Sequence, residues 1–232
     1  MSLKMTPDTV AKREISPWEQ AYLEFETPEE EVNKFRKRLI SFGALSWPRD
    51  VEIVELFCGR GNGLVALERL GFTRLEGIDL SPALLAQYKG LARCVVGDCR
   101  QMPFAAHSKD ILIVQGGLHH LPDLPGDLEQ TLCEARRVLR SDGRLIVVEP
   151  WRTPFLDFVH FVSERAVARA AWSKIRAFAT MTEHEQTTYE QWLNNPQQIL
   201  DCFQRFFTIH SLRIHYGKLM LEGRPQAGRD AK

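Results

Sequence analysis

Between residues 51 and 150, short apolar runs alternate with amphipathic stretches. The runs are rich in Val, Ile and Leu, which is typical of buried strands. The stretches between them carry apolar residues at helical spacing, most clearly at 64–70 and 128–139. Strands that alternate with helices pair in parallel, so this region predicts an α/β protein with a doubly wound sheet. The predicted strands are 51–57, 74–78, 93–96, 110–114 and 143–148.

After Glu149-Pro150 the alternation of strands and helices stops. A long helical stretch with a broad apolar face is predicted at 155–178. Residues 180–191 are polar, and we interpret them as a solvated loop that includes His184 and Glu185. The segment therefore predicts a helical cap or lid beside the sheet, with a polar end.

The last part of the chain predicts a hairpin. A helix at 196–203 precedes two strands, at 206–215 and 218–221, which are joined at Tyr216-Gly217. So short a connection joins neighbouring antiparallel strands, and the sheet is expected to end in an antiparallel hairpin. Near the start of the chain, residues 18–45 also carry apolar side chains at helical spacing.

We therefore expect a core framed by cap segments. Thr27 is expected to cap a helix in the N-terminal segment, with Pro28 in its first turn. The expected parts are an arm with cap helices at 1–45, a core at 46–150, a helical cap or lid at 151–195, a helix and hairpin that complete the core at 196–223, and a disordered tail at 224–232.

The composition is that of an ordinary globular protein. The chain has 232 residues, 44% hydrophobic and 26% charged, which excludes collagen-like and largely disordered classes. Lys plus Arg number 30 and Asp plus Glu number 30, and this zero balance argues against a dedicated nucleic-acid binder. No apolar run approaches the length of a membrane-spanning helix, and the first residues lack a secretory signal pattern.

The cysteine pattern predicts neither a disulfide framework nor a zinc site. The 5 cysteines are odd in number, irregular in spacing and free of any Cys-x-x-Cys. We interpret them as reduced thiols and expect a cytoplasmic protein without a metal site. We also expect the protein to be a monomer or a homodimer and not to insert into a membrane. They are Cys58, Cys94, Cys99, Cys133 and Cys202.

A glycine-rich turn follows the first predicted strand. It begins at Gly59 and contains Gly61 and Gly63, which allow the backbone to approach a ligand closely. The third glycine of a dinucleotide fingerprint would fall on Leu64, and the Gly-Lys-Ser/Thr of a phosphate-binding loop is missing. Glu55 precedes the turn, and an acid there suits a ligand that carries a positive charge.

Two further acids follow the next two strands. Asp79 closes the second strand, where a carboxylate can accept hydrogen bonds from a ribose diol. Asp98 follows the third strand. With Glu55, these acids are expected at the carboxyl edge of the sheet, where open α/β folds bind ligands.

Together these motifs resemble class I S-adenosylmethionine-dependent methyltransferases, and within them the small-molecule type 11 group. The resemblance rests on the order of the acids and glycines described above, on Leu118-His119-His120-Leu121, and on the segment Leu139 to Leu145. It covers residues 51–150 well and the closing hairpin loosely. It implies a Rossmann-like, mostly parallel seven-stranded sheet and S-adenosyl-L-methionine as the cofactor.

The resemblance also implies roles for single residues. Gly59 and Gly61 would face the methionine part of the cofactor near Glu55, and Asp79 would hold the ribose hydroxyls. Asp98 would accept from the adenine amino group. The full set of implied cofactor residues is Glu55, Gly59, Gly61, Asp79, Leu80, Asp98, Cys99 and Gln115. The family usually has glycine where Phe57 stands, so this side chain must point away from the cofactor or reshape its pocket.

Fewer residues in the sequence indicate where the methyl acceptor binds. His119 and His120 follow the fourth strand and are the candidate catalytic bases, because imidazole titrates near neutral pH. His120 matches the family pattern better. Trp18, Tyr22 and Trp151 are expected to wall an acceptor site.

The predicted reaction is methyl transfer to a small molecule by in-line attack on the sulfonium methyl. Two alternatives stay open, a nucleic-acid methyltransferase and a cofactor-binding protein without catalysis. Residues 151–180 hold a modest excess of Arg and Lys, which keeps the first alternative open.

Overall fold

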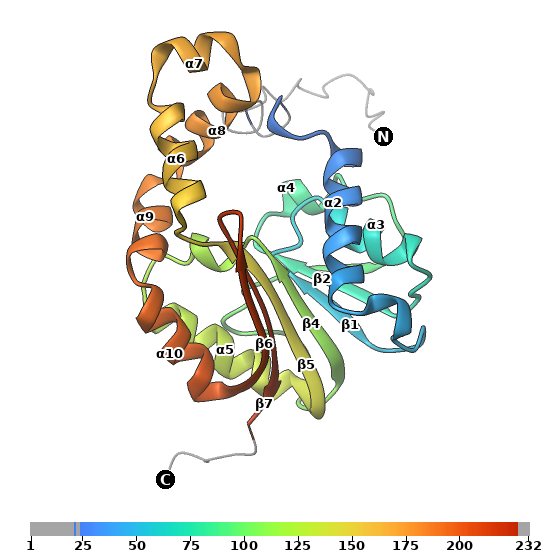
Figure 1. Ribbon diagram of the computed structural model, residues 1–232. Coiled ribbons are helices and arrows are strands. Elements are labelled where there is room, and N and C mark those ends of the chain that lie inside the picture. Colours follow the sequence, from blue (N-terminus) through green and yellow to red (C-terminus); the bar gives the residue numbers. More distant parts are fainter. Residues whose placement is uncertain (1–20, 22–23, 227–232) are drawn as a thin grey trace, which may run out of the picture.

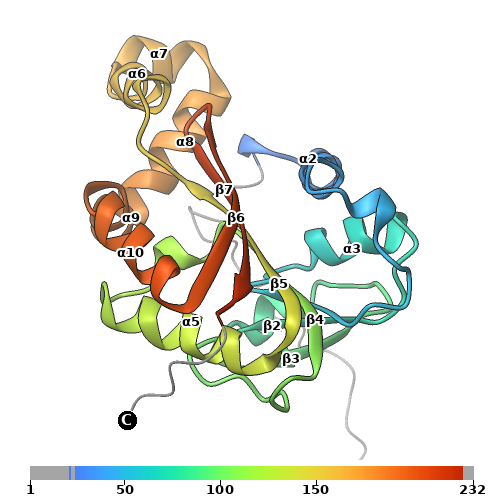
Figure 2. The ribbon, with the colours of Figure 1, turned by 60° about the horizontal axis from the view of Figure 1, so that its bottom comes forward.

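The predicted alternation folds into one seven-stranded sheet with the order β3-β2-β1-β4-β5-β7-β6 (Figures 1 and 2). The computed structural model describes residue 21 and residues 24–226. The strands are β1 (Ile53–Leu56), β2 (Leu75–Asp79), β3 (Arg93–Val96), β4 (Lys109–Gln115), β5 (Leu139–Pro150), β6 (Phe207–His215) and β7 (Lys218–Pro225). The doubly wound α/β fold with a closing antiparallel hairpin is thereby confirmed.

Successive side chains of the central strands pack into two separate hydrophobic cores, one on each face of the sheet. Ile53 of β1 packs with α2 (Pro28–Ser41) and α3 (Asn62–Arg69), whereas the next residue, Val54, packs with the helices of the opposite face. Those helices are α5 (Gly126–Val138), α9 (Gln186–Asn194) and α10 (Pro196–Phe206). Because both faces are covered, β1 is buried at every position, as parallel strands require.

The helix start predicted at Thr27 is confirmed. The Thr27 hydroxyl accepts from the backbone N–H of Glu30, and the Glu30 carboxylate accepts from the backbone N–H of Thr27. This capping box satisfies two backbone donors at the start of α2. Short helical turns elsewhere connect the strands, namely η1 (Ala44–Ser46), α4 (Pro82–Leu85) and η2 (Leu118–His120).

The cap differs from the sequence prediction. The expected helix at 155–178 is divided into three, and the expected polar loop at 180–191 is largely helical. Trp172 has an extended backbone, φ −127° and ψ 111°, which separates two of the helices. Tyr189 and Trp192 are three residues apart and face the core, which holds the last cap helix in place. The cap helices are α6 (Pro154–Ser163), α7 (Ala166–Ala171), α8 (Ser173–His184) and α9.

The closing hairpin has the predicted connection and a longer second strand. Tyr216 and Gly217 have φ values of 46° and 74°, the left-handed pair that a two-residue hairpin turn requires. The second strand was expected to end at residue 221, and a disordered tail to begin at residue 224. Instead β7 continues because Arg224 and Pro225 pair with β6, so the expectation of disorder was wrong at these two residues.

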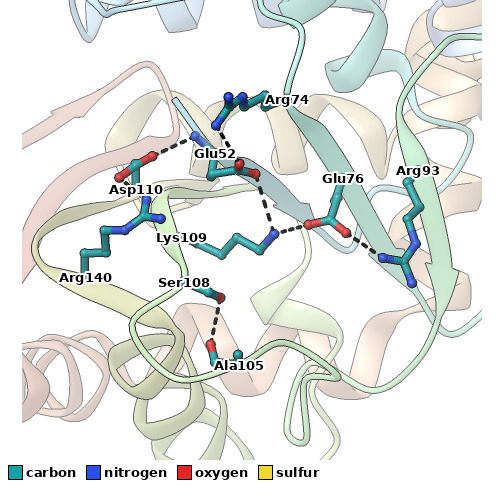
Figure 3. Close-up of polar contacts among 9 residues, drawn as sticks. All are labelled: Glu52, Arg74, Glu76, Arg93, Ala105, Ser108, Lys109, Asp110 and Arg140. Carbon is teal, nitrogen blue, oxygen red and sulfur yellow. Dashed lines mark hydrogen bonds and ion pairs between the residues drawn. The ribbon is translucent and has the colours of Figure 1, made fainter. Parts of the chain in front are cut away.

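A network of charges ties together the amino ends of the central strands (Figure 3). Lys109 at the start of β4 pairs with Glu76 of β2 and lies 3.8 Å from Glu52. The side chains of Lys109 and Glu76 are 11% and 13% exposed, so their charges lie largely out of water. Asp110 accepts from the backbone N–H of Glu52 at 2.7 Å and pairs with Arg140. The other edge of the sheet, at the carboxyl ends of the strands, is therefore the edge left for a ligand.

Within the described part of the chain, every helix is too short or too polar to cross a bilayer.

Candidate active site

A cavity of about 580 Å³ opens at the carboxyl ends of the strands, beside the glycine-rich turn. Its walls come from β1, β2, β4 and the loops after them, with α2 contributing from the side. Most of the residues predicted to bind a cofactor meet on this wall. They are Glu55, Gly59, Asp79, Leu80, Asp98, Cys99 and Gln115.

The turn after β1 needs its glycines for two different reasons. Gly59 and Gly61 have φ values of 51° and 75°, which side chains rarely tolerate. Gly61 precedes α3, and a Cβ on it would lie 2.3 Å from the ring of Tyr88. A Cβ on Gly63 would lie 1.7 Å from the Glu55 carboxylate. The turn can therefore wrap closely around the pocket and around Glu55 itself.

Phe57 adopts a left-handed backbone conformation, which favours the glycine that the resemblance implied for this position. Its φ is 55°, a strained value for a bulky residue. The side chain lines the pocket and packs so closely on Gly117 that a Cβ there would lie 2.4 Å from Phe57. Phe57 therefore lines the cavity while its ring packs on Gly117, and whether it alters cofactor binding stays a prediction.

Glu55 and Gln115 present polar atoms to the pocket from beneath. Gln115 Nε2 donates to Glu55 Oε1 at 3.4 Å. Among the described residues, Glu55 Oε2 and Gln115 Oε1 are buried acceptors without a hydrogen-bond partner. Burial raises the pKa of Glu55 to about 8, opposed by the hydrogen bond from Gln115. Buried polar atoms are normally paired, so these two oxygens indicate a ligand that donates hydrogen bonds.

The Asp79 carboxylate holds backbone groups in place and also lines the pocket. Its Oδ2 accepts from the backbone N–H of Gly59 at 2.8 Å, and its Oδ1 accepts from that of Ser81 at 2.8 Å. These bonds tie the glycine turn to the end of β2. Because each carboxylate oxygen has a second lone pair, Asp79 can still accept from a ligand in the pocket.

Asp98 is engaged by a cation that sequence reasoning did not assign. The Arg100 guanidinium donates to both oxygens of Asp98, at 2.7 Å to Oδ2 and 3.1 Å to Oδ1, and also to Asp127 at 2.7 Å. Arg100 therefore holds the pKa of Asp98 below its usual range. Next to it, burial raises the pKa of Cys99 to about 12, so this thiol is no nucleophile at neutral pH.

Helix α2 adds residues to the pocket that the sequence pattern did not reveal. Glu31 and Phe35 line it, although they lie far from the glycine turn in the chain. Asn62 at the start of α3 donates to Glu31 at 2.6 Å, which joins the helix to the turn. Arg60 of the turn lines the same cavity. The only sequence signal for the helix residues was amphipathic spacing, which a purely structural helix shares, whereas Arg60 stands in the glycine-rich turn itself.

The two histidines differ sharply in their surroundings. His119 Nδ1 lies 2.6 Å from Oε2 of Glu149, which is buried at the end of β5. The other oxygen of Glu149 accepts from the backbone N–H groups of Gly117 and Leu118. This fixed carboxylate orients the His119 ring, and Nε2 is left to face other groups. The strand-end position of Glu149 could have suggested this role, but the residue was not selected from the sequence.

His120 lines the pocket and stacks on His119, with ring centroids 4.0 Å apart. Burial of the ring, and then the charge of His119, lowers the pKa of His120 to about 3. The His120 ring is therefore neutral near pH 7. The sequence favoured His120 as the base; in the structure His120 lines the cavity, and His119 is the ring that a carboxylate supports.

Glu185 reaches the histidines from the cap. It lies between α8 and α9, with Oε2 3.6 Å from His120 Nδ1 and 3.9 Å from His119 Nε2. The ring of Tyr189 meets His119 edge-on at 6.0 Å, and its hydroxyl lies 3.3 Å from His160 Nε2. The expectation that Glu185 belongs to a solvated loop was therefore wrong.

Of the three residues predicted to wall an acceptor site, the described one, Trp151, lies in the core. Trp151 is 5% exposed and packs edge-on against Trp192 in the core, with ring centroids 6.3 Å apart, and it does not line the cavity. Its position after the last parallel strand made it a plausible wall residue, but the ring turns toward α9. Trp18 and Tyr22 lie outside the described residues.

The comparisons with known proteins agree with this geometry. Residues 54–147 match the family model described as Methyltransferase domain. The demethylmenaquinone methyltransferase of Thermus thermophilus is 31% identical over 131 residues, covering 48% of this chain and 58% of that protein. The ubiquinone/menaquinone biosynthesis C-methyltransferase UbiE of Geotalea daltonii is 28% identical over 173 residues, covering 62% of this chain and 71% of that protein. The chain spans about half the length of the curated relatives it matches.

Among solved structures, the PH0226 protein from Pyrococcus horikoshii OT3 has a TM-score of 0.66 at 15% identity, covering 91% of this chain and 99% of that one. Residues 54–147, which include the glycine turn and most of the strand ends around the cavity, therefore match a methyltransferase domain, and the fold is shared with that solved structure. The resemblance in sequence implied S-adenosylmethionine as the cofactor.

The residues of the pocket fit that cofactor. The two buried acceptor oxygens suit its ammonium group, and the close glycine turn leaves room beside them. A guanidinium on the wall, that of Arg60, suits its carboxylate.

Proposed function

We propose that this protein binds S-adenosylmethionine in the cavity and transfers its methyl group to a small organic acceptor. The observation that carries the proposal is the pair of buried oxygens, Glu55 Oε2 and Gln115 Oε1, next to a turn that only glycine can form. In the proposed arrangement the ammonium of the cofactor meets Glu55 and Gln115. Its methionine part follows Gly59 and Gly61.

The remaining predicted residues are proposed to hold the nucleoside. Asp79 accepts from the ribose hydroxyls while keeping its backbone bonds to the glycine turn. Asp98 lies near the adenine amino group, with Arg100 fixing its carboxylate. Leu80 and Cys99 supply apolar and backbone contacts to the two sides of the nucleoside.

When bound, the cofactor supplies a methyl group activated by a positively charged sulfur. An electron pair of the acceptor atom forms a bond to the methyl carbon, and the carbon–sulfur bond breaks with its electrons passing to sulfur. The protein contributes mainly by holding the acceptor in line and excluding water. An acceptor that starts as a protonated oxygen, nitrogen or carbon acid must also lose a proton.

We propose that the turn of His119 and His120 acts on that proton. His120 lines the pocket, and His119 stands behind it with Glu149 as its support. Apolar side chains also line the cavity, those of Phe35, Phe57 and Leu121. Apolar lining next to a polar cluster suits an aromatic or otherwise apolar acceptor with one ionisable group. The names of the UbiE relatives describe C-methylation in ubiquinone and menaquinone biosynthesis, which is chemistry of this kind.

Different segments of the chain are proposed to bind the cofactor and the acceptor. We propose that residues 46–150 and 196–223 form the cofactor-binding core. The segments 1–45 and 151–195 shape the acceptor side. The contact of Glu185 with the histidines supports this for the second segment.

Two measurements test the proposal. Isothermal titration with S-adenosylmethionine and with S-adenosylhomocysteine should give one site per chain and raise the melting temperature. A screen of small aromatic acceptors against duplex and single-stranded nucleic acid should give transfer only to the small molecules. Absence of cofactor binding refutes the proposal. Transfer to nucleic acid, or binding without any transfer across the screen, would favour the two alternatives instead.

A further inference from the structure

Three side chains of the acceptor end converge on one point. His119 and His120 come from η2, and Glu185 comes from the junction of α8 and α9. One ligand atom from each lies within 4.8 Å of the other two. The distances to Glu185 Oε2 are 3.6 Å from His120 Nδ1 and 3.9 Å from His119 Nε2. Ligand atoms around a bound cation at about 2.1 Å lie roughly 3 to 3.5 Å apart, so small side-chain rotations complete such a site.

The contact of His119 with Glu149, behind this cluster, has the form found at metal centres. Its Nδ1 lies 2.6 Å from the buried carboxylate of Glu149, which leaves Nε2 for the cluster. Metal-binding histidines almost always donate their second ring nitrogen to a carboxylate or carbonyl, which fixes the ring and raises its basicity. Glu149 is itself held by two backbone N–H groups, so the ring cannot easily turn away.

Charge and access also suit a cation. Glu149 and Glu185 bring two carboxylates to a cluster that otherwise holds two imidazoles. A divalent cation balances these two charges. The side chains of His120 and Glu185 are 40% and 20% exposed, which provides a way in, while His119 is 11% exposed.

We propose that His119, His120 and Glu185 bind a divalent transition-metal cation of the Zn²⁺ or Co²⁺ type, with Glu149 as the outer partner of His119. Two imidazoles and one carboxylate suit such borderline cations better than Mg²⁺ or Ca²⁺, which prefer oxygen ligands alone. The sequence predicted no metal, because Glu185 is distant from the histidines in the chain and only the folded cap brings it to them.

This site would define the chemistry of the acceptor, and in that respect the inference rests on the proposed function. Three protein ligands leave coordination positions open toward the pocket that His120 lines. A hydroxyl or carbonyl oxygen of the acceptor bound there becomes more acidic or more polarised. The cation would then promote loss of the acceptor proton and also position the acceptor. The substrate class is therefore a small molecule with an oxygen donor next to, or at, the methylated atom.

The test uses the full chain after dialysis against a chelator. Titration with Co²⁺ should give one equivalent per chain and an absorption band of a nitrogen- and oxygen-bound ion, which Zn²⁺ then displaces. Glu185→Gln and His120→Gln should each weaken binding by at least about 100-fold, and Glu149→Gln by about 10- to 100-fold. The control is His184→Gln, an exposed histidine next to Glu185, which should bind as the wild type does.

Each possible result of these titrations either supports or overturns the metal site. Stoichiometric binding lost in Glu185→Gln but kept in His184→Gln supports the site. Failure of the wild type to bind, or equal binding by all variants, overturns it. Circular dichroism confirms that each variant is folded. S-adenosylhomocysteine affinity of the same metal-free samples separates the two hypotheses, because cofactor binding without metal binding refutes only the metal site.

Discussion

Replacing Glu55 with Gln should change the pH dependence of the protein in two measurable ways. Glu55 is 3% exposed, and burial raises its pKa from 4.5 to about 8. Gln has the same shape, so the contact with Gly63 is kept. The substitution therefore removes an ionisable group from the pocket with little other change.

The first effect is on the stability of the cofactor-free protein. A carboxyl whose pKa is raised on folding stabilises the native state fully below pH 4.5, and this stability is lost as pH rises toward about 8. At 1.36 kcal/mol per pKa unit, the loss is on the order of 4–5 kcal/mol for a fully buried group. Urea unfolding followed by circular dichroism at pH 5, 6, 7 and 8 should show this decline in the wild type. In Glu55→Gln this contribution is absent.

The second effect is on the cofactor. Pairing with an ammonium group requires the ionised carboxylate, so Glu55 releases a proton when the cofactor binds. Between pH 6 and 8 the affinity of the wild type for S-adenosylhomocysteine should rise up to about tenfold per pH unit relative to Glu55→Gln. The amino group of the ligand titrates equally in both titrations and cancels in the ratio. Calorimetry in two buffers of different ionisation enthalpy should detect the released proton.

Glu52→Gln is the matched control, because Glu52 lies at the amino end of β1, away from the pocket. It should keep the wild-type pH dependence of cofactor affinity. Parallel pH profiles of wild type and Glu55→Gln, in both stability and affinity, would refute the reasoning about the buried carboxyl and its ligand.

Four further substitutions probe other parts of the structure. Asp79→Ala should weaken S-adenosylhomocysteine binding by about 1.5–3 kcal/mol and also lower the melting temperature, because two backbone donors lose their acceptor; calorimetry and melting curves check both. Glu149→Gln should reduce turnover with an identified acceptor by at least about tenfold at unchanged cofactor affinity, since His119 loses its support; equal turnover would leave Glu149 a structural residue. Lys109→Ala should destabilise by roughly 2–4 kcal/mol in urea unfolding, as it leaves the largely buried Glu76 with only the exposed Arg93 as a cation. Phe57→Gly should relieve left-handed strain but lose packing on Gly117, so a changed cofactor affinity with a small net change in stability is expected; an unaltered affinity would show that Phe57 does not shape the pocket.

Local patterns in the sequence were enough to predict the architecture. Alternating apolar runs and helical spacing predicted the strands and their parallel pairing, because burial on two faces imposes a period on the chain. Thr27 with Glu30, and Tyr216-Gly217, were predictable because capping and tight turns depend on a few adjacent residues. The acids Glu55 and Asp79 could be placed at the sheet edge from their positions at strand ends alone.

Only the tertiary structure decided how the acceptor end is built. Trp151 turns into the core against Trp192, whereas Glu185, expected in a solvated loop, meets His119 and His120. These outcomes depend on how the cap helices pack on the sheet, which brings together residues about 65 positions apart in a way that no local period encodes. The same holds for Glu149, since a buried carboxylate is distinguished from an ordinary strand end only by the groups that the fold places around it.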